Sequence, residues 1–260
     1  MSRVVLITGG SSGIGKEIAR QLTMRGDIPL LLGRNKANLK RVQEELKRGD
    51  FFVCDVTKQG EVEAVVSKVI KRYGSVDVLI NNAGYGRFGG ALDFSPDEYR
   101  AMMETNYLGA VQMTLAMLPH WLQQGGGKVV NIASIAGLSG TPNLAAYAAS
   151  KFALIGFSES LHLEYAPLIQ VGVLCPGPVK TPFFRGEDPG QLFPPALSRK
   201  LLDTRVVARH ALRLIEHPRM KVIPASLRWA IRVRSWFPGL YHHMTHRLYS
   251  RWQQNHKLEV

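Results

Sequence analysis

The chain has 260 residues, of which 45% are hydrophobic and 20% are charged. This ordinary globular composition excludes fibrous, collagen-like and disordered proteins, and the length suits one domain with a substantial core. The net charge of +13 is unevenly spread, because residues 199–260 hold thirteen Lys and Arg against three acids, a net charge of +10. The nearly balanced remainder argues against a nucleic-acid-binding domain.

Cysteine usage and hydropathy bear on the compartment. The two cysteines, Cys54 and Cys175, form no disulfide or metal-ligand pattern, which favours a reducing, cytoplasmic location. The apolar run at 4–7 is too short for a secretory signal, and no run reaches the ~18 to 20 apolar residues that span a bilayer. We expect a protein that is soluble or lies on a membrane surface.

Short apolar runs alternate along the chain with helical patterns. Strands are predicted at 4–8, 29–32, 51–54, 76–80, 128–132, 171–174 and 220–223. Helices are predicted at 15–25, 35–48, 59–73, 96–123, 145–165 and 204–216. The strands are rich in Val, Ile and Leu without polar alternation, as in strands buried on both faces. We therefore predict an α/β fold of Rossmann type over residues 1–224, a doubly wound seven-stranded parallel sheet with helices on both faces.

The first predicted strand leads into a glycine-rich turn that opens a helix. Gly9, Gly13 and Gly15 permit a tight turn, close approach of the backbone to a pyrophosphate, and close packing of helix on strand. The free N–H groups of the helix N-terminus favour negative charge. A turn without a ligand is the alternative, but the position of this turn predicts a dinucleotide site.

A second group of residues points to acid/base chemistry. Tyr147 and Lys151 lie four residues apart in a predicted helix, so their side chains project from one face. We expect the ammonium to lower the pKa of the phenol from about 10 and so make Tyr147 an acid/base. Ser134, at the end of the fifth strand, can donate a hydrogen bond to an oxygen that becomes an alkoxide.

These motifs together resemble the classical short-chain dehydrogenase/reductase family over residues 3–224. They are TGxxxGxG at 8–15, Asn81-Asn82-Ala83-Gly84, Ser134, Tyr147-Ala148-Ala149-Ser150-Lys151 and Pro176-Gly177, in the order of the family. The resemblance implies a catalytic tetrad of Asn106, Ser134, Tyr147 and Lys151, in which Asn106 anchors a water. The cofactor contacts that it implies are Gly9, Ser11, Ser12, Gly13, Ile14, Gly15, Arg34, Asp55, Val56, Asn82, Ala83, Gly84, Tyr147, Lys151, Pro176, Gly177, Val179 and Thr181.

Cofactor preference follows from the residues after the second strand. NAD enzymes usually place a carboxylate there for the ribose 2′-hydroxyl, whereas a 2′-phosphate needs cationic or neutral donors. This chain has Arg34, which predicts NADP(H) in preference to NAD(H), with help from Ser11 or Lys16. The alternative is that Arg34 is only a solvated residue before a helix.

The resemblance implies an oxidoreductase that transfers a hydride between the nicotinamide and a carbonyl or alcohol. A Pro/Gly-rich segment at about 182–202 holds three phenylalanines and matches the family's substrate lid, which favours a steroid-, retinoid- or lipid-like substrate. A core role for those phenylalanines is the alternative. Two other functions stay open, a 3-oxoacyl-thioester reductase and a non-catalytic nucleotide-binding scaffold docked through its tail. No metal site is expected, since the tail histidines lack an acid or cysteine partner.

Residues 225–260 form a basic, aromatic extension. Trp229, Val233, Trp236 and Phe237 share a helical stripe, although Arg234 interrupts the apolar side and Pro238 ends the helix. Aromatic anchors beside arginines suit an interfacial helix on an anionic membrane, here through 226–252. Packing on the domain or on a partner subunit is the alternative. The resemblance implies a homodimer or homotetramer formed through the helices at 96–123 and 145–165.

Overall fold

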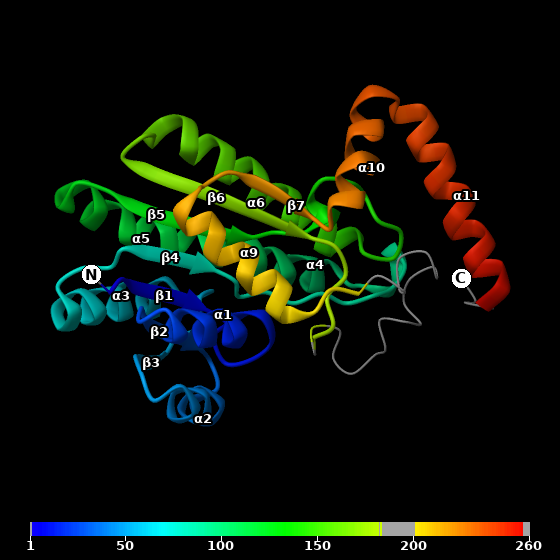
Figure 1. Cartoon of the computed structure of the whole chain (residues 1–260). Helices are drawn as coiled ribbons and strands as arrows, with labels where there is room; N and C mark the ends of the chain where they lie inside the picture. Colours follow the sequence, from blue (N-terminus) through cyan, green and yellow to red (C-terminus); the bar gives the residue numbers. More distant parts are fainter. Residues whose placement is uncertain (1, 182, 184–200, 257–260) are drawn as a thin grey trace.

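The computed structural model describes residues 2–181, 183 and 201–256, with side chains described up to residue 250. Most of the predicted lid at 182–202 therefore lies outside the described residues. The chain forms a seven-stranded parallel sheet in the order β3-β2-β1-β4-β5-β6-β7 (Figure 1). The strands are β1 Val4–Thr8, β2 Ile28–Gly33, β3 Asp50–Val53, β4 Val78–Asn81, β5 Gly127–Ile132, β6 Ile169–Pro176 and β7 Met220–Ile223.

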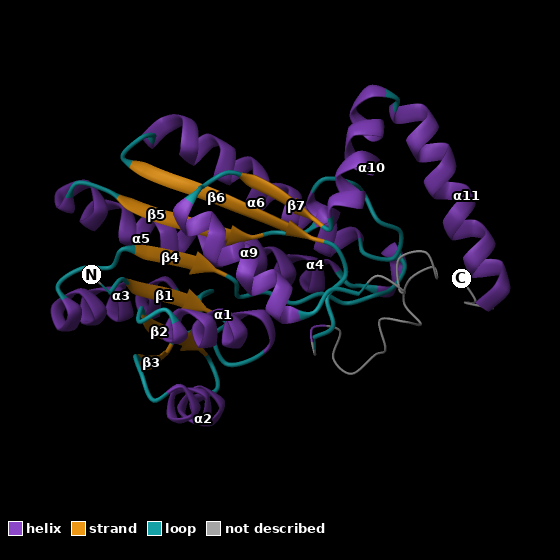
Figure 2. Ribbon diagram, in the orientation of Figure 1, coloured by secondary structure: helices purple, strands orange, loops and turns teal. Residues whose placement is uncertain are grey.

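Helices cover both faces of this sheet (Figure 2). They are α1 Gly13–Met24, α2 Lys36–Leu46, α3 Gln59–Tyr73, α4 Pro96–Met103, α5 Gly109–Gln124, α6 Ala145–Tyr165, α9 Thr204–Glu216, α10 Ala225–Trp236 and α11 Pro238–His256. Short helical turns occur at η1 Ala91–Asp93, η2 Glu104–Leu108 and η3 Ile135–Gly137. The doubly wound Rossmann-type sheet predicted from the sequence is confirmed.

The sheet is buried on both faces because successive side chains of a strand point to opposite sides. In β1, Val4 and Leu6 pack with α3 and α5 in one apolar cluster. Val5 and Ile7 pack with α1, α2 and α9 in the other. The parallel register brings the carboxyl ends of the strands to one edge of the sheet, where ligands bind in such folds.

The prediction of one long α-helix at 96–123 is wrong in one respect, because a π-helical turn separates two α-helices there. The helix α4 ends at Met103, a π-helical turn occupies Glu104–Leu108, and α5 begins at Gly109. The side chain of Asn106 in this turn bonds to the backbone of Tyr85, which lies outside the helix. Such π-helical turns are frequent at functional sites because they redirect a side chain.

The C-terminal extension folds as a helical hairpin. The helix α10 ends at Trp236, and Pro238 begins α11, a second helix that the sequence analysis does not predict. Figure 1 shows the hairpin beyond the carboxyl edge of the sheet. Among the described residues, no helix combines the length and the hydropathy that a bilayer span requires.

Candidate active site

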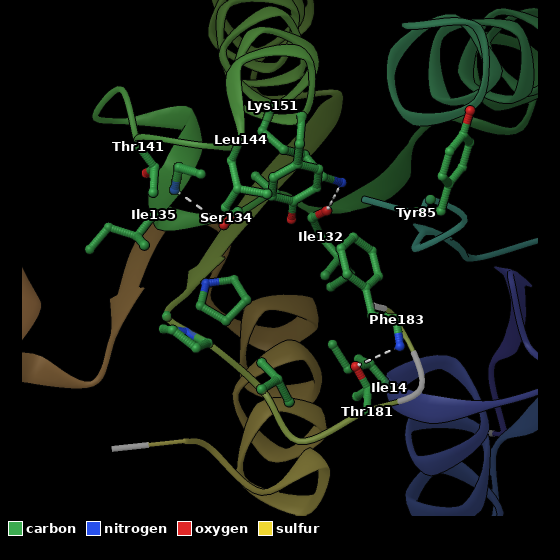
Figure 3. Close-up of a pocket in the computed structure, with 18 of the residues that line it drawn as sticks. Ile14, Tyr85, Ile132, Ser134, Ile135, Thr141, Leu144, Lys151, Thr181 and Phe183 are labelled. Atoms are coloured by element: carbon green, nitrogen blue, oxygen red, sulfur yellow. Dashed lines mark hydrogen bonds between the residues drawn. The ribbon is translucent and has the colours of Figure 1, made fainter. Parts of the chain in front are cut away.

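A cavity of about 1600 Å³ lies at the carboxyl edge of the sheet. Eighteen of the predicted site residues line it: Gly9, Ser11, Ser12, Gly13, Ile14, Arg34, Asp55, Val56, Asn82, Ala83, Gly84, Ser134, Tyr147, Lys151, Pro176, Gly177, Val179 and Thr181. Figure 3 shows Ser134 and Lys151 on one side of this cavity and Ile14 and Thr181 on the other, with Phe183 between them. Gly15 and Asn106 lie behind this lining.

The helix α1 opens at the cavity with the features of an anion site. Its N-cap residue Ser12 makes no side-chain capping hydrogen bond, and the first turn holds no acidic residue. The first N–H groups are therefore available to a phosphate, which the helix dipole also favours. Gly13 adopts a left-handed φ of +53° at the turn. These features fit the pyrophosphate of a dinucleotide.

Gly15 contributes by close packing. A Cβ at this position would lie 2.3 Å from the carbonyl oxygen of Gly9. The amide of Asn82 donates to the carbonyl of Thr8 at 3.0 Å, and the Thr8 hydroxyl accepts from the backbone N–H of Asn82 and Ala83, both at 2.9 Å. The turns after β1 and β4 are thus tied together along one wall of the cavity.

A cationic side chain, Arg34, follows directly after β2 at the wall of the cavity. Arg34 is exposed and lines it, while Lys16 forms an ion pair with Glu45 at 2.6 Å. Lys16 therefore has a partner on α2 rather than a place in the lining. Burial raises the pKa of Asp55, but hydrogen bonds from Thr57 and the charge of Arg34 outweigh burial and leave the pKa below its ordinary value. Asp55 is thus an anion at neutral pH.

The catalytic candidates meet at the opposite end of the cavity. Tyr147 and Lys151 project from α6, and the Lys151 ammonium donates to the carbonyl of Ile132 at 2.9 Å. The Ser134 hydroxyl accepts from the N–H of Ala136 at 3.1 Å, so its own proton can point into the cavity. The Lys151 nitrogen lies 5.8 Å from the centroid of the Tyr147 ring.

Burial determines the protonation of this pair. Burial raises the pKa of Tyr147 to about 12, against a smaller opposing effect of a hydrogen bond from Ser134. Burial also lowers the pKa of Lys151 to about 8. The expectation that the ammonium lowers the phenol pKa is therefore wrong for this structure, because desolvation of the phenolate is the larger effect. Tyr147 is a protonated phenol at neutral pH.

Asn106 is fully buried and acts on the site through its neighbours. Its amide nitrogen donates to the Tyr85 carbonyl at 2.8 Å and to the Ser150 hydroxyl at 3.0 Å, and its oxygen accepts from the Tyr85 N–H at 2.9 Å. The Ser150 hydroxyl donates to the carbonyl of Tyr147 at 2.7 Å. Asn106 therefore joins the segment after β4 to the part of α6 that carries Tyr147.

The tail supplies a part of the cavity wall whose residues were not predicted as site residues. The lining residues from α10 and α11 are Leu227, Ala230, Val233, Tyr241, Met244, Thr245, Arg247, Leu248 and Tyr249. The hydroxyl groups of Tyr241 and Ser139 lie 2.9 Å apart and tie α11 to the segment after β5. Val233 lines the cavity, whereas Trp229 and Trp236, which are predicted on the same stripe, are exposed. The three-residue spacing of 227, 230 and 233 was the available signal.

The described residues hold no group of three or more His, Cys, Asp or Glu side chains that could bind a metal ion.

Comparison with known proteins defines the class of protein. The family model described as short chain dehydrogenase matches residues 3–191. The chain belongs to this family.

Individual relatives cover most of the chain. It is 40% identical over 188 residues to "Dehydrogenase/reductase SDR family member 7" of Homo sapiens, covering 68% of this chain and 56% of that protein. It is 41% identical over 183 residues to "3-ketodihydrosphingosine reductase" of Bacteroides thetaiotaomicron, covering 70% and 65%. The chain thus spans less than two thirds of the length of both proteins. A crystal structure of an actinorhodin polyketide ketoreductase variant with NADPH is 34% identical, with a TM-score of 0.76 over 82% of this chain and 90% of that one.

Proposed function

We propose that this protein is an NADP(H)-dependent oxidoreductase that interconverts a carbonyl and an alcohol on a hydrophobic, lipid-like molecule. The observation that carries the proposal is one cavity with a glycine-turn helix N-terminus at one end and Ser134, Tyr147 and Lys151 at the other. This arrangement favours the enzyme over a non-catalytic nucleotide-binding scaffold, because a scaffold has no need of buried acid/base groups.

Each catalytic residue has a role in carbonyl reduction. When bound, the nicotinamide supplies the hydride. Tyr147 donates its phenolic proton to the carbonyl oxygen, and its raised pKa keeps that proton in place at neutral pH. Ser134 donates a hydrogen bond to the same oxygen as negative charge develops there. The ammonium of Lys151 stabilises the phenolate that remains, and Asn106 acts as a positioning residue for α6.

The preference for NADP(H) rests on Arg34. It is an exposed cation on the cavity wall after β2, where a 2′-phosphate can pair with a guanidinium. Ser11 lines the cavity close to the same turn and supports this proposal. The remaining proposed cofactor contacts are the lining residues of the turns after β1, β3, β4 and β6 that are named above.

The hydrophobic substrate is supported by the tail wall. Leu227, Val233 and Leu248 give the cavity an apolar side, and the edge of the Phe183 ring contacts Tyr147, with a centroid separation of 5.3 Å. The relative named as a 3-ketodihydrosphingosine reductase acts, by its name, on a lipid ketone. The likeness to a polyketide ketoreductase favours a 3-oxoacyl thioester as the second candidate substrate.

We also propose a homodimer or homotetramer formed through α4, α5 and α6. The exposed side chains of Leu115, Leu122 and Phe152 on these helices support this assembly. The free, buried thiols of Cys54 and Cys175 support a reducing, cytoplasmic location. Residues 1–224 form the proposed catalytic domain and residues 225–260 its extension, with peripheral membrane contact through 226–252.

The test is oxidation of NADPH and NADH by the purified protein with a panel of carbonyls. The panel spans a small diketone, a steroid ketone, retinal, a long-chain aliphatic ketone and an acetoacetyl thioester. Turnover of the apolar ketones with NADPH is the expected result. Turnover confined to the thioester would replace the lipid substrate with the second candidate. Cofactor binding without turnover of any panel member would contradict the proposed enzyme.

A further inference from the structure

The α10–α11 hairpin has two faces of different character. Its inner face lines the cavity and is anchored by the hydrogen bond between Tyr241 and Ser139. Its outer face exposes large apolar side chains, since Trp229, Trp236 and Phe237 are each more than half exposed. Trp229 and Trp236 lie seven residues apart, which places them on the same face of α10. Grouped exposed aromatics of this kind mark an interaction surface.

The charge of this outer face is of one sign. Residues 217–258 contain no Asp or Glu. Arg232 is exposed on α10, and its guanidinium lies 5.1 Å from the centroid of the Trp229 ring. Aromatic rings interleaved with arginines match the interface of a bilayer whose headgroups are anionic.

A second copy of this chain fits the same face poorly. A two-fold interface places the same patch on both subunits, so arginine would lie opposite arginine. No acidic side chain between 217 and 258 could neutralise them. Charge complementarity therefore selects an anionic lipid surface rather than a partner of identical sequence.

The apolar lining of the cavity extends to the solvent-exposed surface of α11. Met244 and Leu248 line the cavity, yet they are 59% and 40% exposed. Together with Leu240 they occupy every fourth position of α11 and form one stripe. A hydrophobic molecule that leaves a bilayer beside this stripe can move into the cavity along apolar side chains, without crossing water.

We propose that the outer face of the hairpin docks on an anionic bilayer and that apolar substrate enters the cavity from that bilayer past Met244 and Leu248. The docking is independent of catalysis, whereas the route of the substrate rests on the proposed reductase activity. Trp229, Trp236 and Phe237 are the anchors, Arg232 supplies the attraction to anionic headgroups, and the Met244–Leu248 stripe is the portal.

Docking is tested by cosedimentation of the full chain with vesicles. Vesicles of phosphatidylcholine are compared with an equimolar mixture of phosphatidylcholine and phosphatidylglycerol. We expect binding to the mixture, a loss of at least about tenfold in the partition coefficient for Trp236→Ala/Phe237→Ala, and a loss of about fivefold for Arg232→Glu. Matched controls are Leu163→Ala, a residue that is 83% exposed on α6, and Lys71→Glu on α3, both expected to bind like the parent chain.

Several outcomes would overturn the docking proposal. The parent chain would fail to bind the mixed vesicles, or Trp236→Ala/Phe237→Ala would bind as well as the controls do. An oligomer in light scattering that Trp236→Ala/Phe237→Ala reduces to a monomer would assign the face to a second copy instead.

The portal is tested with a long-chain aliphatic ketone dissolved in the vesicles, with a small diketone in solution as the reference. We expect mixed vesicles to raise the rate of NADPH oxidation with the long-chain ketone several-fold over phosphatidylcholine vesicles, and to leave the diketone rate unchanged. Leu240→Asp lies on the same stripe but outside the cavity lining, and it should abolish the stimulation while keeping the diketone rate. Equal rates in both vesicles, with the diketone turned over, would overturn the portal and leave the reductase intact. Failure with every carbonyl would instead contradict the reductase, while docking would still be decided by cosedimentation.

Discussion

At the scale of single residues, the site is governed by desolvation. Tyr147 and Lys151 are both buried, and burial favours the neutral form of each group. It therefore raises the pKa of Tyr147 and lowers the pKa of Lys151. The phenol is thereby kept as a proton donor, which suits reduction. The lysine is left as a cation whose charge is lost only slightly above neutral pH.

Removal of the Tyr147 hydroxyl tests the acid. We expect Tyr147→Phe to lower kcat for carbonyl reduction by about 100- to 10,000-fold, the usual range for loss of a positioned proton donor. NADPH affinity, followed by fluorescence, should stay within about twofold. Tyr165→Phe, at the far end of α6, is the control and should keep full activity. An active Tyr147→Phe protein would remove this residue from the mechanism.

The pH dependence of reduction reports on Lys151. Because burial lowers the pKa of Lys151 from its ordinary value of 10.5 to about 8, the ammonium loses its proton as the pH rises through about 8. Tyr147 remains protonated there, because its pKa is about 12. We expect kcat/KM for the diketone to be constant below this range and to fall above it. In Lys151→Arg the guanidinium stays charged, so whatever activity remains should show no such fall. Persistence of the fall in this variant would assign it to another group.

Reversal of charge at Arg34 tests the cofactor preference. Arg34→Asp should reduce kcat/KM for NADPH about tenfold and raise it for NADH, because a carboxylate repels the 2′-phosphate and binds the ribose hydroxyl. Arg41→Asp, an exposed cation on α2, is the control. The measured quantity is the ratio of the two kcat/KM values, and an unchanged ratio would show that Arg34 is only a solvated residue.

At the scale of elements, close packing between α1 and the turn after β1 holds the phosphate end of the cavity. Gly15 belongs to the helix rather than to the cavity lining, and its missing side chain lets α1 approach Gly9 and Asn82. The π-helical turn between α4 and α5 has an equivalent role at the catalytic end, since it aims Asn106 at the segment after β4. The packing at Gly15 and the π-helical turn at Asn106 both depend on contacts between different secondary-structure elements.

A methyl group at position 15 tests the close packing of α1 on the turn after β1. Gly15→Ala would place a Cβ 2.3 Å from the Gly9 carbonyl oxygen, so α1 must shift. We expect the free energy of unfolding to fall by about 1–3 kcal/mol and NADPH affinity to fall with it. Gly156→Ala in α6 is the control, because its Cβ meets nothing within 4 Å, and it should stabilise the protein by about 0.5–1 kcal/mol. Urea denaturation of both variants measures the difference.

At the scale of the whole molecule, the tail completes the cavity. The helices α10 and α11 follow the last strand and return over the carboxyl edge of the sheet (Figure 1). Their inner residues form the apolar wall opposite the cofactor turns, and the Tyr241–Ser139 hydrogen bond fixes α11 to the domain. We therefore propose that the tail, which lies beyond the predicted domain, contributes to the selection of the substrate.

Loss of the Tyr241–Ser139 hydrogen bond tests this assignment. Tyr241→Phe should raise KM for the long-chain ketone about two- to tenfold, the usual effect of a lost hydrogen bond, and leave kcat for the small diketone unchanged. Tyr165→Phe again serves as the control. Equal KM values for Tyr241→Phe and the control would mean that α11 is held by its packing alone.

The sheet and the composition of the cofactor turns could both be predicted from local sequence patterns. Apolar runs without polar alternation specify strands buried on both faces, and the parallel topology then sends the turns that hold Gly9, Arg34, Asn82 and Ser134 to one edge. These properties depend on local pattern and strand order. The pattern of apolar and glycine residues along one sequence is therefore enough to predict the sheet and its turns.

Tertiary structure alone decided the pKa of Tyr147, the π-helical turn at Asn106 and the place of the tail. The first depends on how much water the fold removes from the phenol, and the second on a hydrogen bond to the backbone of Tyr85 across elements. The tail pattern was compatible with both membrane contact and packing on the domain. Helical periodicity does not tell which side of a helix packs on protein. The position of α10 and α11 beside the cavity was needed to show that Val233 lines the cavity while Trp236 is exposed.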